Sequence, residues 1–296
     1  MGPQRLADNG LLGFIGLGAM GGRMARNLCR ADYSVLGYDL DQVRVRECAE
    51  TGVVEASGPV QIATECDIVL TSVRSSEAWV ALMEEHLVPR ARGGQTFVDL
   101  GTVAPPQTRR IGAALADKGA ALVDAPVSGG PGGAETGTLR IFVGGNAEAL
   151  DRVRPILEVL GDPARIVHCG PCGAGQVVKG CNQVAMGVAD AAYMEALSFG
   201  IAQGIDPEAI IQGVGGDEGW RGHFAALARQ IVAGREDGRE TKYPELPYYI
   251  EESNEHGLEM PLVRALHRYG LGLPNDKPDC MGRPTIAFWP AVLRRR

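Results

Sequence analysis

Three polar side chains share one face of a predicted helix near the middle of the chain. The segment 173–200 has a helical pattern, in which Lys179, Asn182 and Gln183 are spaced i, i+3 and i+4. Their neighbours are small or apolar, so the lysine would be partly removed from water. Because desolvation disfavours the charged ammonium, such a lysine can exchange a proton with an alcohol near neutral pH. A lysine that only extends from an apolar face to solvent is the alternative.

A loop of small residues forms a second candidate site. The stretch DAPVSGGPGGA at 124–134 follows a predicted strand and exposes several backbone N–H groups. Ser128 adds a hydroxyl donor, and Gly129 and Gly130 follow it. Because such donors can hold an anion, the loop predicts a site for a carboxylate or a phosphate. The alternative is a flexible linker, against which the two prolines and the adjacent strand argue.

The third candidate site is a glycine-rich turn near the start of the chain. A buried strand over 11–17 and a helix from residue 22 flank a G-x-G-x-x-G spacing, whose residues are Gly16, Leu17, Gly18, Ala19, Met20 and Gly21. This arrangement is typical of a loop that binds the pyrophosphate of a dinucleotide. Asp39 ends the next predicted strand, where its carboxylate would accept bonds from the ribose hydroxyls and repel a 2′-phosphate. We therefore expect NAD, with NADP possible because Arg44 or Arg74 could reach a phosphate.

The elements that must position these residues alternate between strand and helix through the first half. This order predicts an α/β fold, an N-terminal Rossmann-type doubly wound sheet, followed by an all-helical C-terminal domain joined by a long helix. Ligands bind beyond the carboxyl ends of the strands, so we expect one crevice lined by Gly16, Asp39, Val73, Thr102 and Ser128. We predict an NAD(P)-binding domain over 1–170 and a domain for substrate and oligomerisation over 171–296.

Composition excludes several classes of protein. The chain of 296 residues has a net charge of −7, which does not suggest a nucleic-acid or anionic-membrane partner. It has no uninterrupted run of 18 apolar residues, so we expect no membrane-spanning segment. Its seven scattered cysteines predict reduced thiols in the cytoplasm and no metal site. The pair Cys169 and Cys172 leaves a zinc or redox site as the alternative.

The three stretches together resemble the β-hydroxyacid dehydrogenases, the family of 3-hydroxyisobutyrate dehydrogenase and tartronate semialdehyde reductase. The matching segments are GFIGLGAMG at 13–21, DAPVSGGPGGAETGTL at 124–139 and GQVVKGCNQ at 175–183. The resemblance implies that the first domain binds NAD(P) and that Lys179 is the catalytic acid and base. It also implies that Ser128, Gly129 and Gly130 bind the substrate carboxylate, with Asn182 and Gln183 orienting the substrate, a small carboxylic acid.

The resemblance extends from about residue 11 to residue 262. It implies that Thr102 lies beside the nicotinamide and that Lys242 is a further lysine near the cofactor and the active site. Tyr243 follows Lys242 where the family usually has aspartate, and nothing after about Leu266 is familiar. The identity of the substrate therefore stays open.

Two alternative functions also stay open, an imine reductase-like enzyme and a binding scaffold or sensor without turnover. A phosphogluconate dehydrogenase is disfavoured, because those enzymes have histidine at the position that Asn182 occupies in this chain. We expect a homodimer or homotetramer.

Overall fold

The computed structural model describes residues 11–233 and 245–270. Of residues 269 and 270 it describes the backbone alone. The chain divides into two compact units, residues 1–179 and residues 180–296, and each is described by itself. The division falls inside the helix α8 (Ala174–Ala202). The domain boundary predicted at residue 170 lies just before this helix and stays a prediction.

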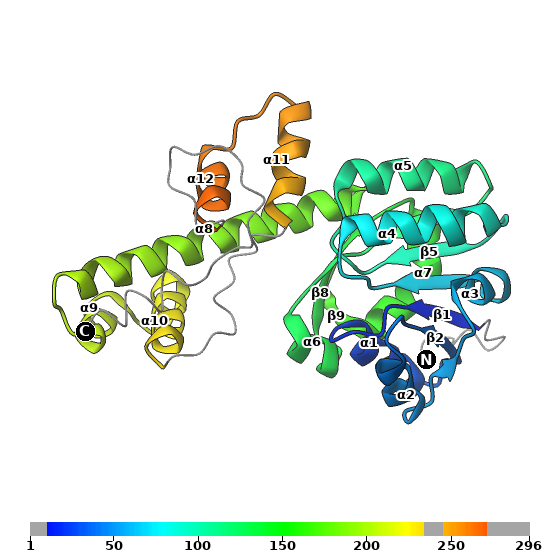
Figure 1. Cartoon of the computed structure of the whole chain (residues 1–296), viewed down its shortest axis with the longest axis horizontal. Coiled ribbons are helices and arrows are strands. Elements are labelled where there is room, and N and C mark those ends of the chain that lie inside the picture. The colour runs from blue at the N-terminus through cyan, green and yellow to red at the C-terminus, as the bar shows by residue number, and fades with distance from the viewer. Residues whose placement is uncertain (1–10, 234–244, 271–296) are drawn as a thin grey trace. The chain divides into compact units, whose positions relative to one another are not determined.

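The first unit is built on a mostly parallel sheet (Figure 1). In the described ranges it has nine strands: β1 (Leu12–Ile15), β2 (Val35–Tyr38), β3 (Val54–Glu55), β4 (Ile68–Thr71), β5 (Thr96–Asp99), β6 (Ala121–Asp124), β7 (Val127–Ser128), β8 (Leu139–Gly144) and β9 (Gly161–Gly170). Their order is β3-β2-β1-β4-β5-β6-β8-β7, with β9 parallel to β8. The strand β1 pairs with β2 on one side and with β4 on the other, so the strand order reverses at β1. Ligands bind at this point of reversal in such sheets.

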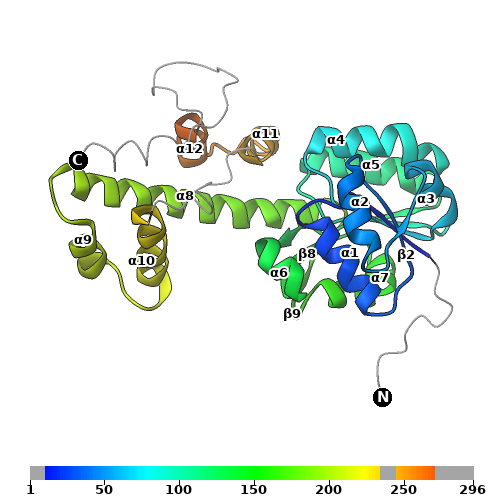
Figure 2. The ribbon, with the colours of Figure 1, turned by 60° about the horizontal axis from the view of Figure 1, so that its bottom comes forward.

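Helices cover both faces of this sheet, as an α/β pattern requires (Figure 2). One face carries α1 (Gly21–Arg30), α2 (Gln42–Ala49), α6 (Gly130–Thr136) and α7 (Ala147–Leu160). The other face carries α3 (Pro59–Glu65), α4 (Ser76–Leu82) and α5 (Pro105–Ala116). The helix α4 continues as a π-helical turn over Met83–Leu87 and a 3₁₀ turn over Val88–Arg90. The two apolar cores between helices and sheet make the strands rigid, and the loops at their ends are thereby positioned.

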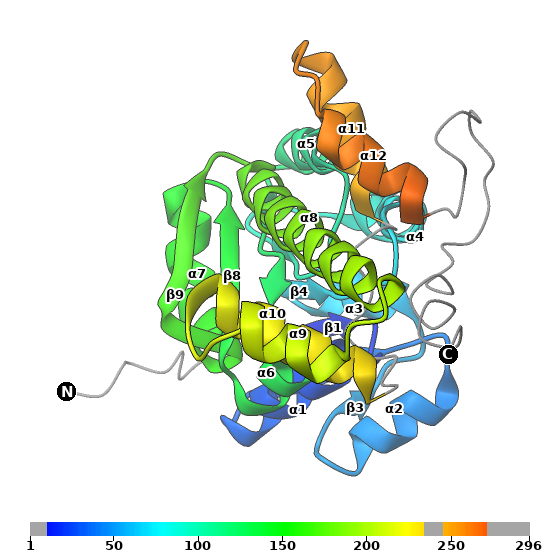
Figure 3. The same ribbon diagram turned by 90° about the vertical axis from the view of Figure 1, so that its left-hand side faces the viewer.

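The predicted fold class is confirmed, but the short strands β3 and β7, the helices α3 and α6 and three further features were not predicted. The strand β8 runs antiparallel to β6 and β7, and α7 and β9 are additional elements (Figure 3). The pattern of α7 is interrupted by Pro155, which usually marks the end of a helix. The strand β9 buries only two of its ten residues and so lacks the apolar run of a buried strand.

The described part of the second unit is helical, as predicted. The residues of α8 from Gly180 onward contact two helix pairs. The pair α9 (Pro207–Val214) and α10 (Gly219–Val232) packs around Met194 and Leu197 of α8. The pair α11 (Leu246–Glu255) and α12 (Pro261–Gly270) packs with Val184, Val188 and Ala191.

The helix α8 is unusually long and apolar. By length and composition alone it could cross a membrane, since an 18-residue window has a mean hydropathy of 1.2, and 22% of that window is buried. A helix of a globular protein passes the same test, so the expectation that no segment spans a membrane stays a prediction.

Candidate active site

The glycine turn after β1 has the shape that its spacing predicts. Gly16 has φ of +92°, and a Cβ there would lie 2.3 Å from the carbonyl oxygen of Ser72. A Cβ on Gly21 would lie 1.8 Å from the carbonyl oxygen of Gly16, so only glycine lets α1 begin this close to β1. No side chain of the described residues caps the first turn of α1, and no acidic residue lies in this turn. Its N–H groups therefore fit the pyrophosphate of a dinucleotide.

Asp39 joins the end of β2 to this turn. Its Oδ2 accepts a hydrogen bond from the backbone N–H of Leu17 at 2.6 Å, and its Oδ1 accepts one from Asp41 at 2.8 Å. The carboxylate is half-buried, with lone pairs left for two ribose hydroxyls. The guanidinium of Arg44 lies beside Gly18, 3.1 Å from an ideal Cβ there, and pairs with Asp41. The residues after β1 and β2 thus fit an adenosine ribose.

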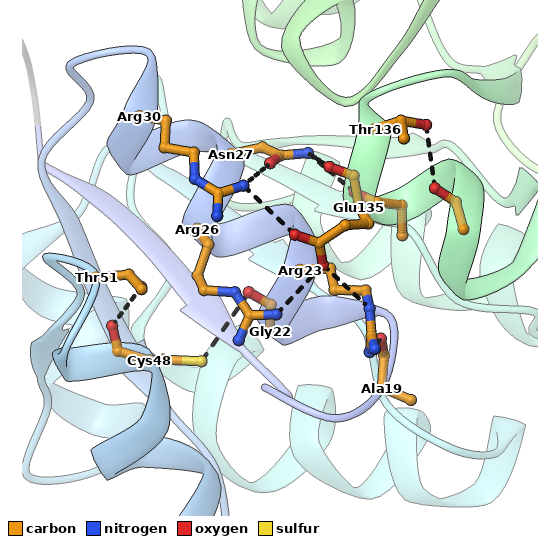
Figure 4. Close-up of polar contacts among 12 residues, drawn as sticks. Ala19, Gly22, Arg23, Arg26, Asn27, Arg30, Cys48, Thr51, Glu135 and Thr136 are labelled. Atoms are coloured by element: carbon orange, nitrogen blue, oxygen red, sulfur yellow. Dashed lines mark hydrogen bonds and ion pairs between the residues drawn. The ribbon is translucent and has the colours of Figure 1, made fainter.

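The helix α1 also contacts α6, the helix that follows the small-residue loop (Figure 4). Asn27 is buried and donates to the carbonyl oxygen of Ala134 at 2.9 Å. The carboxylate of Glu135 pairs with three cations on α1, namely Arg23 at 3.2 Å and both Arg26 and Arg30 at 3.5 Å. The helices α1 and α6 are therefore joined by the amide of Asn27 and by the carboxylate of Glu135.

The small-residue loop and Lys179 meet within the first unit. Lys179 is 6% exposed, and its Nζ donates to the carbonyl oxygen of Val127 at 2.8 Å. Ser128 lies in the short strand β7 rather than after a strand end, and it is half-buried. Gly129 and Gly130 lead into α6 with φ of +139° and +62°, conformations that favour glycine. The lysine amine is thus held by the loop expected to bind an anion, at the residue before Ser128.

A buried polar network holds the first turn of α8, which carries Lys179. The carboxylate of Asp124 accepts bonds from the N–H groups of Gly173 at 2.7 Å and Gln176 at 3.0 Å, and so caps the helix. The side chain of Gln176 donates to Asp99 at 3.1 Å and to the carbonyl oxygen of Gly101 at 3.0 Å, and it accepts from Val103 at 3.1 Å. Asp99 also accepts from the hydroxyl of Thr71 at 3.0 Å. Each of these three polar side chains on β5, β6 and α8 has several partners.

Burial changes the protonation of both carboxyl groups in this network. Desolvation raises the pKa of Asp99 to about 7, against the lowering effect of the Gly101 N–H and the Thr71 hydroxyl, while the nearby Asp124 raises it further. Desolvation also raises the pKa of Asp124, opposed by the N–H groups of Gly173 and Gln176. Asp99 therefore gains or loses a proton close to neutral pH.

Asn182 and Gln183 belong to the second unit, where Gln183 is almost fully buried. Its amide donates to the carboxylate of Glu245, and Asn182 donates to the sulfur of Met186 at 3.4 Å. Tyr249 packs on Gly180, where an added Cβ would lie 2.6 Å from the ring. Its hydroxyl is buried and has no hydrogen-bond partner within 11–233 and 245–270. Glu245 is thus a neighbour of the predicted substrate residues that the sequence did not indicate.

Other predicted site residues follow the strand ends. Val73 comes after β4 and Thr102 after β5, and both strands are parallel neighbours on one side of β1. The carbonyl oxygen of Val73 is 3.5 Å from an ideal Cβ on Gly101, so the two loops are adjacent. Lys242 lies outside the described residues. Gln176, Asp99 and Asp124 were missed as a group, although a glutamine three residues before Lys179 on the same helix face was a usable signal.

The C-x-x-C pair has separate partners. The thiol of Cys169 donates to the carbonyl oxygen of Val167 at 3.3 Å, and that of Cys172 donates to the carbonyl oxygen of Thr108 at 3.8 Å. Burial raises the pKa of both thiols, that of Cys172 to about 12. These contacts do not favour a redox or zinc site, for which thiolates are needed.

Comparison with known proteins identifies the family. Residues 11–170 match the family model described as the NAD binding domain of 6-phosphogluconate dehydrogenase. A 3-hydroxyisobutyrate dehydrogenase from Pseudomonas aeruginosa is 39% identical over 201 residues, which are 67% of each chain. A 2-(hydroxymethyl)glutarate dehydrogenase from Eubacterium barkeri is 32% identical over 259 residues, 85% of each chain.

The fold is shared with a solved relative. The structure of a Mycobacterium tuberculosis 3-hydroxyisobutyrate dehydrogenase with L-serine aligns with a TM-score of 0.74 and 26% identity, covering 87% of this chain and 91% of that one. With the dinucleotide turn and the sheet order described above, these matches confirm the predicted family and the NAD(P) cofactor. The chain belongs to the β-hydroxyacid dehydrogenase family and is an NAD(P)-dependent oxidoreductase of hydroxyacids.

Proposed function

We propose that this enzyme oxidises a small β-hydroxyacid with NAD, and that Lys179 accepts the hydroxyl proton. The observation that carries the proposal is the buried Lys179 amine, 2.8 Å from the carbonyl oxygen of Val127 and hence next to Ser128. The cofactor, when bound, accepts the hydride from the carbinol carbon. In the reverse direction, Lys179 returns the proton to the alkoxide oxygen, directly or through a water molecule.

The substrate carboxylate is assigned to Ser128, Gly129 and Gly130. The Ser128 hydroxyl and the N–H groups of the two glycines supply donors, and a bulky side chain would be strained at either glycine. Asn182 and Gln183 are assigned to substrate orientation. The Gln183 amide donates to Glu245, and its oxygen accepts from the Asn182 amide at 3.4 Å, so the two side chains are held together. Lys242 remains assigned near the cofactor through the family resemblance alone.

The cofactor is assigned to the turn from Gly16 to Gly21, to Asp39, and to the loops of Val73 and Thr102. We assign NAD rather than NADP because a 2′-phosphate would meet the carboxylate of Asp39, and like charges in contact cost several kcal/mol. Arg44 is paired with Asp41 at 3.2 Å, which reduces the positive charge it offers a phosphate. Tighter binding of NADP than of NAD in a titration would contradict this preference.

The enzyme is proposed to be a cytoplasmic homodimer or homotetramer with no nucleic-acid or membrane partner. Large apolar side chains of α8 face solvent in the single chain, including Met186 at 37% and Phe199 at 70% exposure. A second copy would cover them, as symmetric assemblies commonly do with such surfaces. The net charge of −7 supports the absence of an anionic partner.

The decisive experiment measures NAD reduction with a series of short β-hydroxyacids, for the parent enzyme and for Lys179→Ala and Lys179→Arg. Arginine keeps the charge but does not release its proton. We expect both variants to lose roughly 10² to 10⁴ in kcat and to keep NAD affinity. NAD binding without turnover on any hydroxyacid would instead support a binding scaffold. Turnover on cyclic imines alone would support an imine reductase.

A further inference from the structure

Gln176 connects three parts of the first unit through one buried amide. It is 0% exposed, lies on α8 three residues before Lys179, and therefore occupies the same helix face. Its amide nitrogen donates to Asp99 at the end of β5 and to the carbonyl oxygen of Gly101, and its oxygen accepts from the N–H of Val103. The loop 101–103 that it holds at both ends includes Thr102.

We propose that Gln176 is a positioning residue that sets the rotation of α8 and so holds the Lys179 amine at the reacting hydroxyl. Asp124 accepts bonds from N–H groups of the first turn and so fixes where the helix begins. Gly175 packs closely against the carbonyl oxygen of Phe142 on one side of the helix. The three bonds from Gln176 are directed to another side, to Asp99 at the end of β5 and to the following loop, and together with these contacts they set the rotation of the helix.

The consequence for catalysis follows from the geometry of proton transfer. The role of Gln176 rests on the proposed function, in which Lys179 takes a proton across a hydrogen bond of roughly 2.6–3.2 Å. Displacing a reacting group by about 1 Å costs on the order of 10²-fold in rate. The same amide also bonds to the carbonyl oxygen of Gly101 and the N–H of Val103, the two residues that flank Thr102.

Gln95 provides a matched control in the same unit. It is 1% exposed, and its amide nitrogen donates to the carbonyl oxygens of Ala63 and Cys66, both at 2.8 Å. Its oxygen accepts from the N–H of Arg92 at 2.9 Å. Gln95 is therefore also a buried amide with two donated bonds and one accepted bond, although both of its acceptors are backbone carbonyls, and its partners lie in α3 and the loops before β4 and β5. Gln95→Leu and Gln176→Leu should lower Tm by similar amounts.

The first test compares these two variants below their Tm, after titration of each with NAD. We expect Gln176→Leu to lose about 10²-fold in kcat, with the Kd for NAD within about threefold of the parent. Gln95→Leu should keep kcat within about twofold. Equal kcat in both variants, with equal loss of Tm, would reduce Gln176 to a stabilising residue and overturn the proposal.

The second test reverses the polarity of the bond between Gln176 and Asp99. Gln176→Glu alone places two carboxylates together, while the double variant with Asp99→Asn lets the new amide donate to the new carboxylate. A glutamate oxygen still accepts from the N–H of Val103 in both variants, whereas the bond to the carbonyl oxygen of Gly101 is lost in both. We expect kcat of the double variant to exceed that of Gln176→Glu by about tenfold. No recovery in a double variant that folds and binds NAD would contradict the proposed contact.

The positioning role of Gln176 can still be tested if the proposed function is wrong. If the parent enzyme oxidises no hydroxyacid, the function is wrong, and crystal structures of the two leucine variants then test the position directly. The contact between the Lys179 Nζ and the carbonyl oxygen of Val127 should be lost in Gln176→Leu and kept in Gln95→Leu. Retention of that contact in Gln176→Leu would overturn the positioning role.

Discussion

Asp99 should make the stability of this protein depend on pH in an unusual direction. Burial raises its pKa from an ordinary 3.8 to about 7, so the folded protein binds this proton more tightly than the unfolded chain. The free energy of unfolding therefore falls as the pH rises from about 4 to about 7. Buried carboxyl groups that are stabilised as anions have the opposite effect, because their pKa is lowered.

The magnitude follows from the difference between the two pKa values. A pKa raised from 3.8 to about 7 corresponds to a loss of about 4 kcal/mol in the free energy of unfolding between pH 4 and pH 8. Asp99 is fully buried, so solvent does not screen this effect. Compared with a typical stability of about 5–15 kcal/mol, the contribution is large.

The assay is urea unfolding of the parent enzyme and of Asp99→Asn from pH 4 to pH 8. Asparagine places an NH₂ group against the amide of Gln176, so the variant should be less stable at pH 4. The two curves should converge by about 4 kcal/mol as the pH rises, because only the parent has the titrating group. If Asp99→Asn runs parallel to the parent, Asp99 is ionised throughout and the reasoning from burial is wrong.

Three further predictions concern other parts of the chain. Gly21→Ala should abolish NAD binding and lower Tm, because its Cβ would lie 1.8 Å from the carbonyl oxygen of Gly16, and unchanged NAD affinity in a titration would contradict this. Gly180→Ala should lower the free energy of unfolding by about 1–3 kcal/mol through contact with the Tyr249 ring. Gly213→Ala, whose Cβ would have no neighbour within 4 Å among the described residues, should raise it by up to about 1 kcal/mol, and urea unfolding of both variants measures the contrast. Among the described cysteines, a thiol reagent at pH 8 should modify the exposed Cys181 first and Cys66 last, because Cys66 is 0% exposed and burial raises its pKa to about 12. Peptide mapping would show the order, and early modification of Cys66 would refute it.

The sequence by itself determined the parts of this protein that depend on local pattern. The turn from Gly16 to Gly21 needs glycine at fixed spacing, because a carbonyl oxygen occupies the space of a side chain. Apolar runs ending in small or polar residues predicted strands β1, β2, β4, β5 and β6, because strands buried on both faces are apolar throughout. The helical spacing of Lys179, Asn182 and Gln183 predicted their shared face, since that face depends only on the helix period.

Only the tertiary structure decided which distant groups meet. Nothing in the sequence pairs Asp99 with Gln176, because 77 residues separate them and the contact depends on the order of the strands. The same holds for Glu135 and its three arginines on α1, and for the antiparallel β8, whose direction its own residues do not encode. The raised pKa of Asp99 likewise comes from the helices and strands that exclude water from it, and not from its sequence neighbours. Local residue patterns determine local structure, whereas burial and long-range hydrogen bonds arise only when the elements pack.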